Sequence, residues 1–130
     1  MKVVDPGHLY ILRELDGSQF NEPVYLTFVK RKGPNYPGNE DAYAGTTLQE
    51  VLRACCERLR YVGKQGEILN QPENEANTTA LGHLREAILA LEVRAAKRHG
   101  RDSSTLTLDE AEFGKTCTKC NHVGCEGGCH

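Results

Sequence analysis

The chain has 130 residues, of which 38% are apolar, enough for one ordinary domain with a modest core. Its 16 Lys and Arg residues against 18 Asp and Glu residues give a net charge of −2, which excludes a global attraction to nucleic acid or an anionic membrane. No apolar run reaches the roughly 20 residues that span a bilayer, and the start, MKVVDPGHLY, lacks the apolar stretch of a signal peptide. We therefore expect a cytoplasmic protein.

The first third of the chain predicts a small antiparallel sheet. Residues 8–15 alternate loosely and are followed by the turn sequence Asp-Gly-Ser. After Pro23 comes VYLTFVKRK, in which one face carries Val24, Leu26 and Phe28. A lone β-hairpin is marginal in water, so we expect its apolar face to pack on the helices or to join strands from another chain. Residues 32–45 are rich in Gly, Pro and Asn, which predicts a long loop.

Residues 46–99 predict two amphipathic helices. Thr47 and Glu50 fit a capping box at the start of the first helix, and Gly63 is expected to end it. Residues 64–75 read as a linker, and the second helix is expected over residues 77–99. The sequence thus predicts an α+β fold, in which a small N-terminal antiparallel hairpin or sheet packs on an antiparallel two-helix hairpin.

We divide the chain into three parts on this basis. Residues 1–100 form the ligand-binding domain of strands and helices. Residues 101–116 are polar and form a linker with at most one short ordered piece. Residues 117–130 form a cysteine-rich tail that resembles a zinc knuckle in its spacing.

The tail, CTKCNHVGCEGGCH, predicts a metal site. In a reducing cytosol, cysteines at this spacing are better explained as metal ligands than as disulfides. The predicted metal is one structural zinc ion, because four protein ligands leave no open position for a catalytic water. The expected ligands are Cys117, Cys120, Cys125 and Cys129, with His130 as the alternative fourth ligand.

Arginines on the predicted helices suggest a site for a phosphorylated ligand. Each guanidinium offers a planar set of donors that suits phosphate groups. The other interpretation is that these arginines are solvated and pair with nearby glutamates. We find no nucleophile with a base, no P-loop and no dinucleotide fingerprint, so the chain is expected to be a binding protein and not an enzyme.

Four segments within residues 3–99 carry a resemblance to a known family: PGHLYILRELDG, LTFVKRKGPNYPGN, GTTLQEVLRACCERLRYV and NTTALGHLREAILALEVRAAKR. Together they resemble the phage Thoeris anti-defence sponge proteins, whose helical hairpin is related to that of the phage anti-CBASS sponges. Cys55 and Cys56 depart from the pattern, because they stand where larger aliphatic residues are expected. The cysteine-rich tail lies outside the resemblance.

The resemblance implies sequestration. Such proteins bind a glycocyclic ADP-ribose type of immune signal, made by a TIR-domain enzyme, and hold it without cleaving it; some also bind cyclic oligonucleotides. They form dimers that can assemble into hexamers, with pockets shared between protomers. Carried over to this chain, the ligand contacts are Arg31, Arg53, Arg58, Asn77 and Arg94, with Phe20 or Tyr10 as a stacking ring.

Two other interpretations stay open. The tail, with the basic stretches at residues 30–32 and 97–101, could belong to a small zinc-knuckle-like nucleic-acid-binding phage protein. The tail offers few aromatic residues for stacking bases, which favours a structural metal over nucleic-acid recognition. The helices could also serve assembly alone.

Overall fold

The structure is a computed structural model that describes residues 1–15, 22–31, 42–69 and 71–125. These residues form an antiparallel sheet, several helices and a cysteine cluster, which confirms the predicted α+β class. The chain divides into two compact units, Met1–Thr47 and Leu48–His130. The boundary between these units falls at the start of the first helix, and the division into residues 1–100, 101–116 and 117–130 stays a prediction. The packing of the sheet on the helices stays a prediction.

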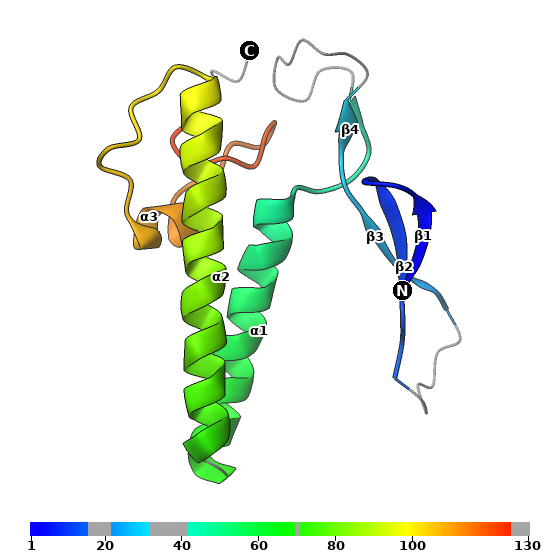
Figure 1. The fold of residues 1–130 in the computed structure, drawn as a ribbon, viewed down its shortest axis with the longest axis vertical. Helices are drawn as coiled ribbons and strands as arrows, with labels where there is room; N and C mark the ends of the chain where they lie inside the picture. The colour runs from blue at the N-terminus through cyan, green and yellow to red at the C-terminus, as the bar shows by residue number, and fades with distance from the viewer. Residues whose placement is uncertain (16–21, 32–41, 70, 126–130) are drawn as a thin grey trace. The chain divides into compact units, whose positions relative to one another are not determined.

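The first unit holds a three-stranded antiparallel sheet of β1 (Lys2–Asp5), β2 (Leu9–Leu12) and β3 (Val24–Thr27), in that order (Figure 1). The sequence prediction omitted β1, which pairs with β2 through a tight turn where His8 N donates to Asp5 O at 3.0 Å. Gly7 adopts φ +77° in this turn, a conformation that glycine reaches without steric cost.

Two short strands, β4 (Lys30–Arg31) and β5 (Ala42–Tyr43), pair across the two ends of the predicted loop. Beside them the backbone of Phe28 approaches Gly45 so closely that a Cβ at position 45 would lie 2.5 Å from the Phe28 carbonyl carbon. This contact explains the glycine, because any side chain there would displace the backbone. The middle of the predicted loop lies outside the described residues.

The second unit is built on two long helices, α1 (Leu48–Leu69) and α2 (Gln71–Arg98), which lie side by side (Figure 1). The predicted end of the first helix at Gly63 and the linker over residues 64–75 are wrong, because this whole stretch is helical except for residue 70, which lies outside the described part. A glycine inside a helix costs only about 1 kcal/mol relative to alanine. Pro72 falls in the first turn of α2, where a proline breaks no helical hydrogen bond.

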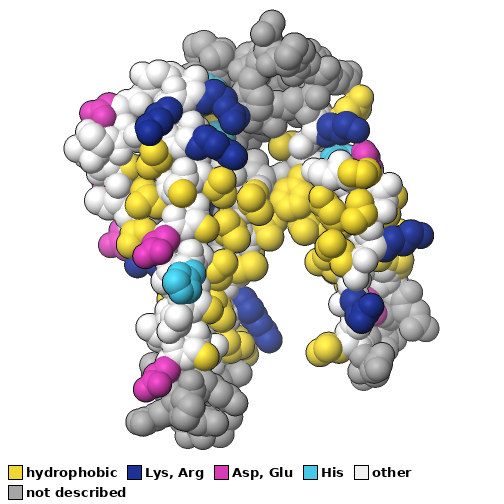
Figure 2. All heavy atoms as spheres, in the orientation of Figure 1, with side chains coloured by type: hydrophobic (Ala, Val, Ile, Leu, Met, Phe, Trp, Pro, Cys, Tyr) yellow, Lys and Arg dark blue, Asp and Glu magenta, His cyan; other side chains and the backbone are white. Residues whose placement is uncertain are grey.

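The core of this unit lies between α1, α2 and a third helix, α3 (Leu108–Phe113). Cys56, Ile88 and Ala111 are fully buried, and four leucines pack around them: Leu52, Leu81, Leu84 and Leu89. Cys56 is the buried member of the adjacent cysteine pair, whereas Cys55 is exposed. In Figure 2, hydrophobic side chains follow the helices, and Lys and Arg side chains gather toward the C-terminal end of α2.

Helix α3 is the short ordered piece within the predicted linker. Thr107 caps it, since its hydroxyl accepts a hydrogen bond from Glu110 N at 3.1 Å. Ala111 fixes α3 to the other helices through its buried methyl group. The polar sequence hid this helix, because a six-residue element shows little periodicity.

Candidate metal centre

Three of the four predicted ligands come together. The sulfur atoms of Cys117, Cys120 and Cys125 all lie within 4.8 Å of one another, and no disulfide joins any of them to a described residue. Two sulfurs bound to one tetrahedral zinc ion are about 3.8 Å apart, so the cluster is close to the geometry that a metal needs. The other two predicted ligands, Cys129 and His130, lie outside the described residues.

The backbone around Cys117 forms a tight turn. Asn121 N donates to Cys117 O at 2.9 Å, and Cys117 N donates to His122 O at 3.0 Å. Lys119 N lies 3.4 Å from Cys117 Sγ, a contact that stabilises a thiolate. Asn121 adopts φ +58°, which asparagine tolerates better than most residues. These hydrogen bonds close the turn that contains Cys117 and Cys120.

Polar side chains from the helices and the following loop bind the backbone of this turn, which we call the cysteine turn (residues 117–125). Glu92 Oε2 accepts from Val123 N at 3.2 Å, Arg53 Nη1 donates to Asn121 O at 3.1 Å, and Arg101 Nη1 donates to Val123 O at 2.9 Å. The backbone groups that these side chains bind belong to Asn121 and Val123, which lie between Cys120 and Cys125 in the sequence. They hold the cysteine turn in place from outside the metal-ligand set.

Two of the anchoring groups, Glu92 and Arg53, have side chains that are almost fully buried and neutralise each other. Glu92 is 1% exposed and accepts from Arg53 Nη2 at 2.7 Å. His122 is buried beside them, with Nδ1 3.0 Å from Gln49 Nε2, so that in the neutral ring Nδ1 accepts from the amide. An unpaired charge at this depth would cost several kcal/mol, and the pairing of Glu92 with Arg53 avoids that cost.

Burial raises the pKa of the Cys120 thiol. Without a metal, this thiol is therefore neutral near pH 7. A bound divalent cation would displace the proton, because metal ligation requires the thiolate. The cluster can thus hold a metal, and binding would release protons.

A second polar cluster lies where α1, α2 and α3 meet. Arg60 donates to both carboxylate oxygens of Glu112, and Arg85 Nε donates to the same carboxylate at 2.7 Å. Arg85 also pairs with Asp109. Hydrogen bonding from Arg60 holds the pKa of Glu112 below its ordinary value. Nothing in the sequence singled out this cluster.

The predicted ligand contacts are dispersed. Arg53 donates to Ala111 O, Asn121 O, Glu50 and Glu92, and its side chain is only 9% exposed. Arg58 and Arg94 are exposed on α1 and α2, with the Arg58 guanidinium 5.8 Å from the centre of the Tyr61 ring. These contacts show that Arg53 is part of the protein interior.

The remaining predicted contacts lie elsewhere. Arg31 is in β4, in the other unit, and Phe20 lies outside the described residues. Tyr10, the alternative ring, packs edge-on against Phe28 within the sheet at a centroid distance of 6.0 Å. Asn77 is inside α2 and lines a pocket of about 260 Å³ between α1 and α2, together with Arg60 and Thr78.

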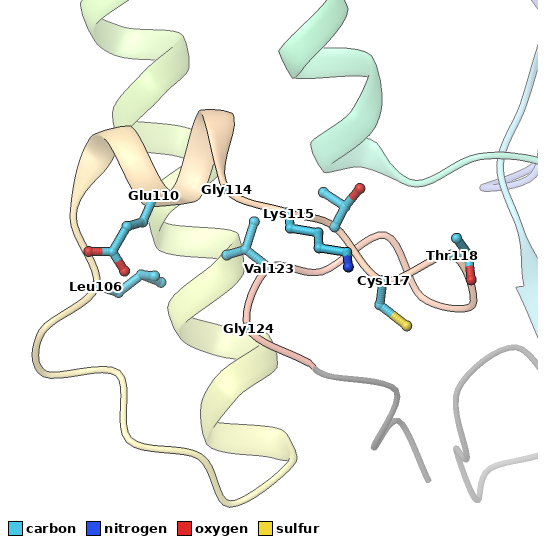
Figure 3. Close-up of a pocket in the computed structure, with 9 residues that line it drawn as sticks. Leu106, Glu110, Gly114, Lys115, Cys117, Thr118, Val123 and Gly124 are labelled. Atoms are coloured by element: carbon cyan, nitrogen blue, oxygen red, sulfur yellow. The ribbon is translucent and has the colours of Figure 1, made fainter.

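A larger pocket, of about 760 Å³, lies between α3 and the cysteine turn (Figure 3). Leu106 and Glu110 line one end, and Lys115, Cys117 and Thr118 line the other. One predicted metal ligand therefore borders an open cavity.

Sequence reasoning missed Glu92 and His122 as supports of the metal cluster. One signal for Glu92 was available, since it falls one turn after the buried Ile88 and one turn before the buried Ala96. An acidic residue on an apolar helix face predicts a buried partner. His122 gave no comparable signal.

Comparisons with known proteins do not identify the chain. No family model matches it, and neither a curated protein nor a solved structure matches it significantly. Among the described residues, no helix is long and apolar enough to cross a membrane.

Proposed function

We propose that this chain is a non-enzymatic binding protein that sequesters a compact cyclic nucleotide, of the cyclic ADP-ribose or cyclic oligonucleotide class. The resemblance to the phage Thoeris anti-defence sponges implies this function. In that role the protein would hold an immune signal in the host cytoplasm without cleaving it. The two-helix hairpin of α1 and α2 would carry the ligand.

The observation that supports this proposal best is a cationic turn on α2. Arg94, Lys97 and Arg98 are exposed and follow one another at helical spacing, so their side chains share one face. By comparison, the side chain of Arg53 is only 9% exposed. A pyrophosphate needs accessible cationic donors, and the cationic turn offers them.

The separation of Asn77 and Arg94 limits how one ligand could contact both residues. They are 17 residues apart on one helix, which corresponds to about 26 Å along its axis. One compact ligand cannot touch both residues of the same protomer. The pocket at Asn77, about 260 Å³, is also smaller than the roughly 300 Å³ at which ligand sites usually begin. The proposal therefore includes a dimer, or a hexamer built from dimers, in which a site combines Arg94 of one protomer with the Asn77 pocket of another.

We further propose that the metal is one structural zinc ion. Its ligands would be Cys117, Cys120, Cys125 and Cys129, with His130 as the alternative fourth ligand. The zinc would fix the cysteine turn against the helices, which agrees with the buried anchors Glu92 and Arg53. Four protein ligands give a closed site without a catalytic position.

Isothermal titration calorimetry of the zinc-loaded protein against cyclic ADP-ribose isomers and cyclic oligonucleotides tests the proposal. Arg94→Ala should weaken binding by about 1.5 to 3 kcal/mol, because a charge-assisted contact to phosphate is lost. Lys119→Ala, which removes an exposed cation of the cysteine turn, is the matched control and should leave the affinity unchanged. The ligand should be recovered intact after heat denaturation.

Recovery of only hydrolysed ligand, or no binding by any member of the panel, would refute the proposal. The second candidate is a nucleic-acid binder, which exposed Lys115 and Lys119 near the cysteines favour. That function predicts steeply salt-dependent oligonucleotide binding that Lys119→Ala weakens. Within residues 114–125 the only ring is that of His122, and it is buried, so base stacking there lacks a platform.

A further inference from the structure

The polar cluster of Arg60, Arg85, Asp109 and Glu112, where α1, α2 and α3 meet, lies beside an exposed aromatic ring. Phe113, the last residue of α3, is 63% exposed, although α3 buries Ala111 and Glu112 next to it. The ring of Phe113 is therefore accessible from solvent.

Two guanidinium groups flank this ring. The Cζ atom of Arg60 lies 4.7 Å from the centre of the Phe113 ring, and that of Arg85 lies 5.9 Å from it. Both arginines are held in place by Glu112, whose side chain is 3% exposed. Those bonds and the one to Asp109 use two of the five N–H donors on each guanidinium. Donors for a further acceptor therefore exist beside a fixed aromatic surface.

Arg60 also connects the ring to the pocket at Asn77. Its side chain lines that pocket, together with Asn74, Asn77 and Thr78. The pocket offers amide and hydroxyl groups. The guanidinium of Arg60 lies over the Phe113 ring, so the same arginine contacts the pocket and the ring. Aromatic faces next to arginine are a common way to bind nucleobases, because every base has a face that can stack.

We infer that Phe113 is the base-stacking platform of the nucleotide site, with Arg60 and Arg85 binding acceptor atoms at the edge of the stacked base. This inference rests on the proposed function and specifies which part of the ligand the α1–α2–α3 junction recognises. It replaces Phe20 and Tyr10 as the candidate ring. The residue lies outside the segment that carries the family resemblance.

The chain contains no tryptophan, so Phe113→Trp places a single fluorescent reporter at the site. Titration of this variant with 3′,3′-cyclic di-AMP and with cyclic ADP-ribose should quench its emission at ligand concentrations that match the calorimetric affinity. Phe113→Leu keeps an apolar side chain but removes the aromatic face, and should weaken binding about tenfold. Tyr25→Leu removes a similarly exposed ring from β3 and should leave the affinity unchanged.

The outcomes separate this inference from the proposed function. If the unmodified protein binds a nucleotide, but Phe113→Leu binds as tightly and Phe113→Trp shows no quenching, the stacking role is wrong and the function stands. If the unmodified protein binds neither nucleotide nor any other member of the panel, both are wrong. Unfolding of each variant in urea checks that Phe113→Leu is folded. If Phe113→Leu is not folded, quenching of the tryptophan emission of Phe113→Trp by the nucleotide decides the case.

Discussion

At the scale of single residues, the arginines of the second unit divide into two groups. Arg53 lies within reach of four internal acceptors, including the carboxylate of Glu92, whereas Arg94 is exposed on α2. Arg53 has Glu50 and Glu57 at helical spacing, but the contacts that bury its side chain come from residues distant in sequence, which local spacing does not reveal. The difference arises from tertiary packing, which brings the cysteine turn and α3 onto α1. We therefore leave Arg53 out of the proposed ligand contacts.

Glu112 should make folding stability depend on pH. Arg60 holds the pKa of Glu112 below its ordinary value of 4.5, so the native protein takes up a proton here less readily than the unfolded chain. The ionised carboxylate stabilises the fold above the ordinary value, and this contribution is lost as the pH falls through the lowered pKa. At about pH 7, Glu112→Gln should lower the free energy of unfolding by about 2 kcal/mol, and the difference should shrink below about pH 4.5.

Urea unfolding of both proteins across this pH range measures the difference. Loss of metal at low pH affects both proteins equally and cancels. Glu86→Gln, at an exposed glutamate of α2, is the control and should show almost no difference at any pH. A gap between the unmodified protein and Glu112→Gln that stays constant with pH would contradict the role assigned to the Arg60 pair.

At the scale of elements, the sequence predicts the type of each long segment better than its ends. The two apolar helices and the strands β2 and β3 follow from periodicity, which depends on local burial. The helix ends depend on small energies: Gly63 and Gly66 in α1 and a proline in the first turn of α2 did not outweigh the packing of α1 on α2. Strand β1 was missed because Met1 to Asp5 is too short to show a clear period.

The candidate metal site could be predicted in part for a similar reason. The first two cysteines lie three positions apart, so chain geometry alone brings them together. Cys125 was predicted from the knuckle-like spacing of the tail, and the structure places its sulfur with the other two. The supports Glu92 and Arg53 come from residues distant in sequence, and their role could not be read from spacing.

Metal removal should loosen the cysteine turn before the long helices. Hydrogen exchange of the zinc-loaded protein should show protected amides at Asn121 and Val123, whose N–H groups bind Cys117 O and Glu92. A chelator should accelerate their exchange by at least about tenfold, because the thiols no longer hold the turn closed. The amide of Ile88, in the middle of α2, should change much less.

Matched cysteine variants identify the ligands. Native mass spectrometry should find one zinc ion per chain in the unmodified protein and in Cys55→Ser, since Cys55 is exposed and outside the cluster. Cys120→Ser should lose the ion. Zinc retained at full stoichiometry by Cys120→Ser would show that Cys120 is not a required ligand. Exchange that the chelator leaves unchanged would show that the cysteine turn does not depend on a metal.

At the scale of the whole molecule, the predicted ligand contacts are divided between the two compact units. The sheet carries Arg31, and the helical unit carries Asn77 and Arg94 at positions about 26 Å apart along α2. A single protomer therefore presents parts of a site and not a complete one. Assembly of two protomers would bring an Arg94 from one chain to the Asn77 pocket of another.

Mixed dimers test this central claim most directly. Arg94→Ala and Asn77→Ala should each weaken nucleotide binding when present in both protomers. A dimer of one Arg94→Ala chain and one Asn77→Ala chain keeps one site with both residues intact, so calorimetry should find the original affinity at half the number of ligand molecules per chain. Mixed dimers that bind no better than either variant alone would contradict a site shared between protomers.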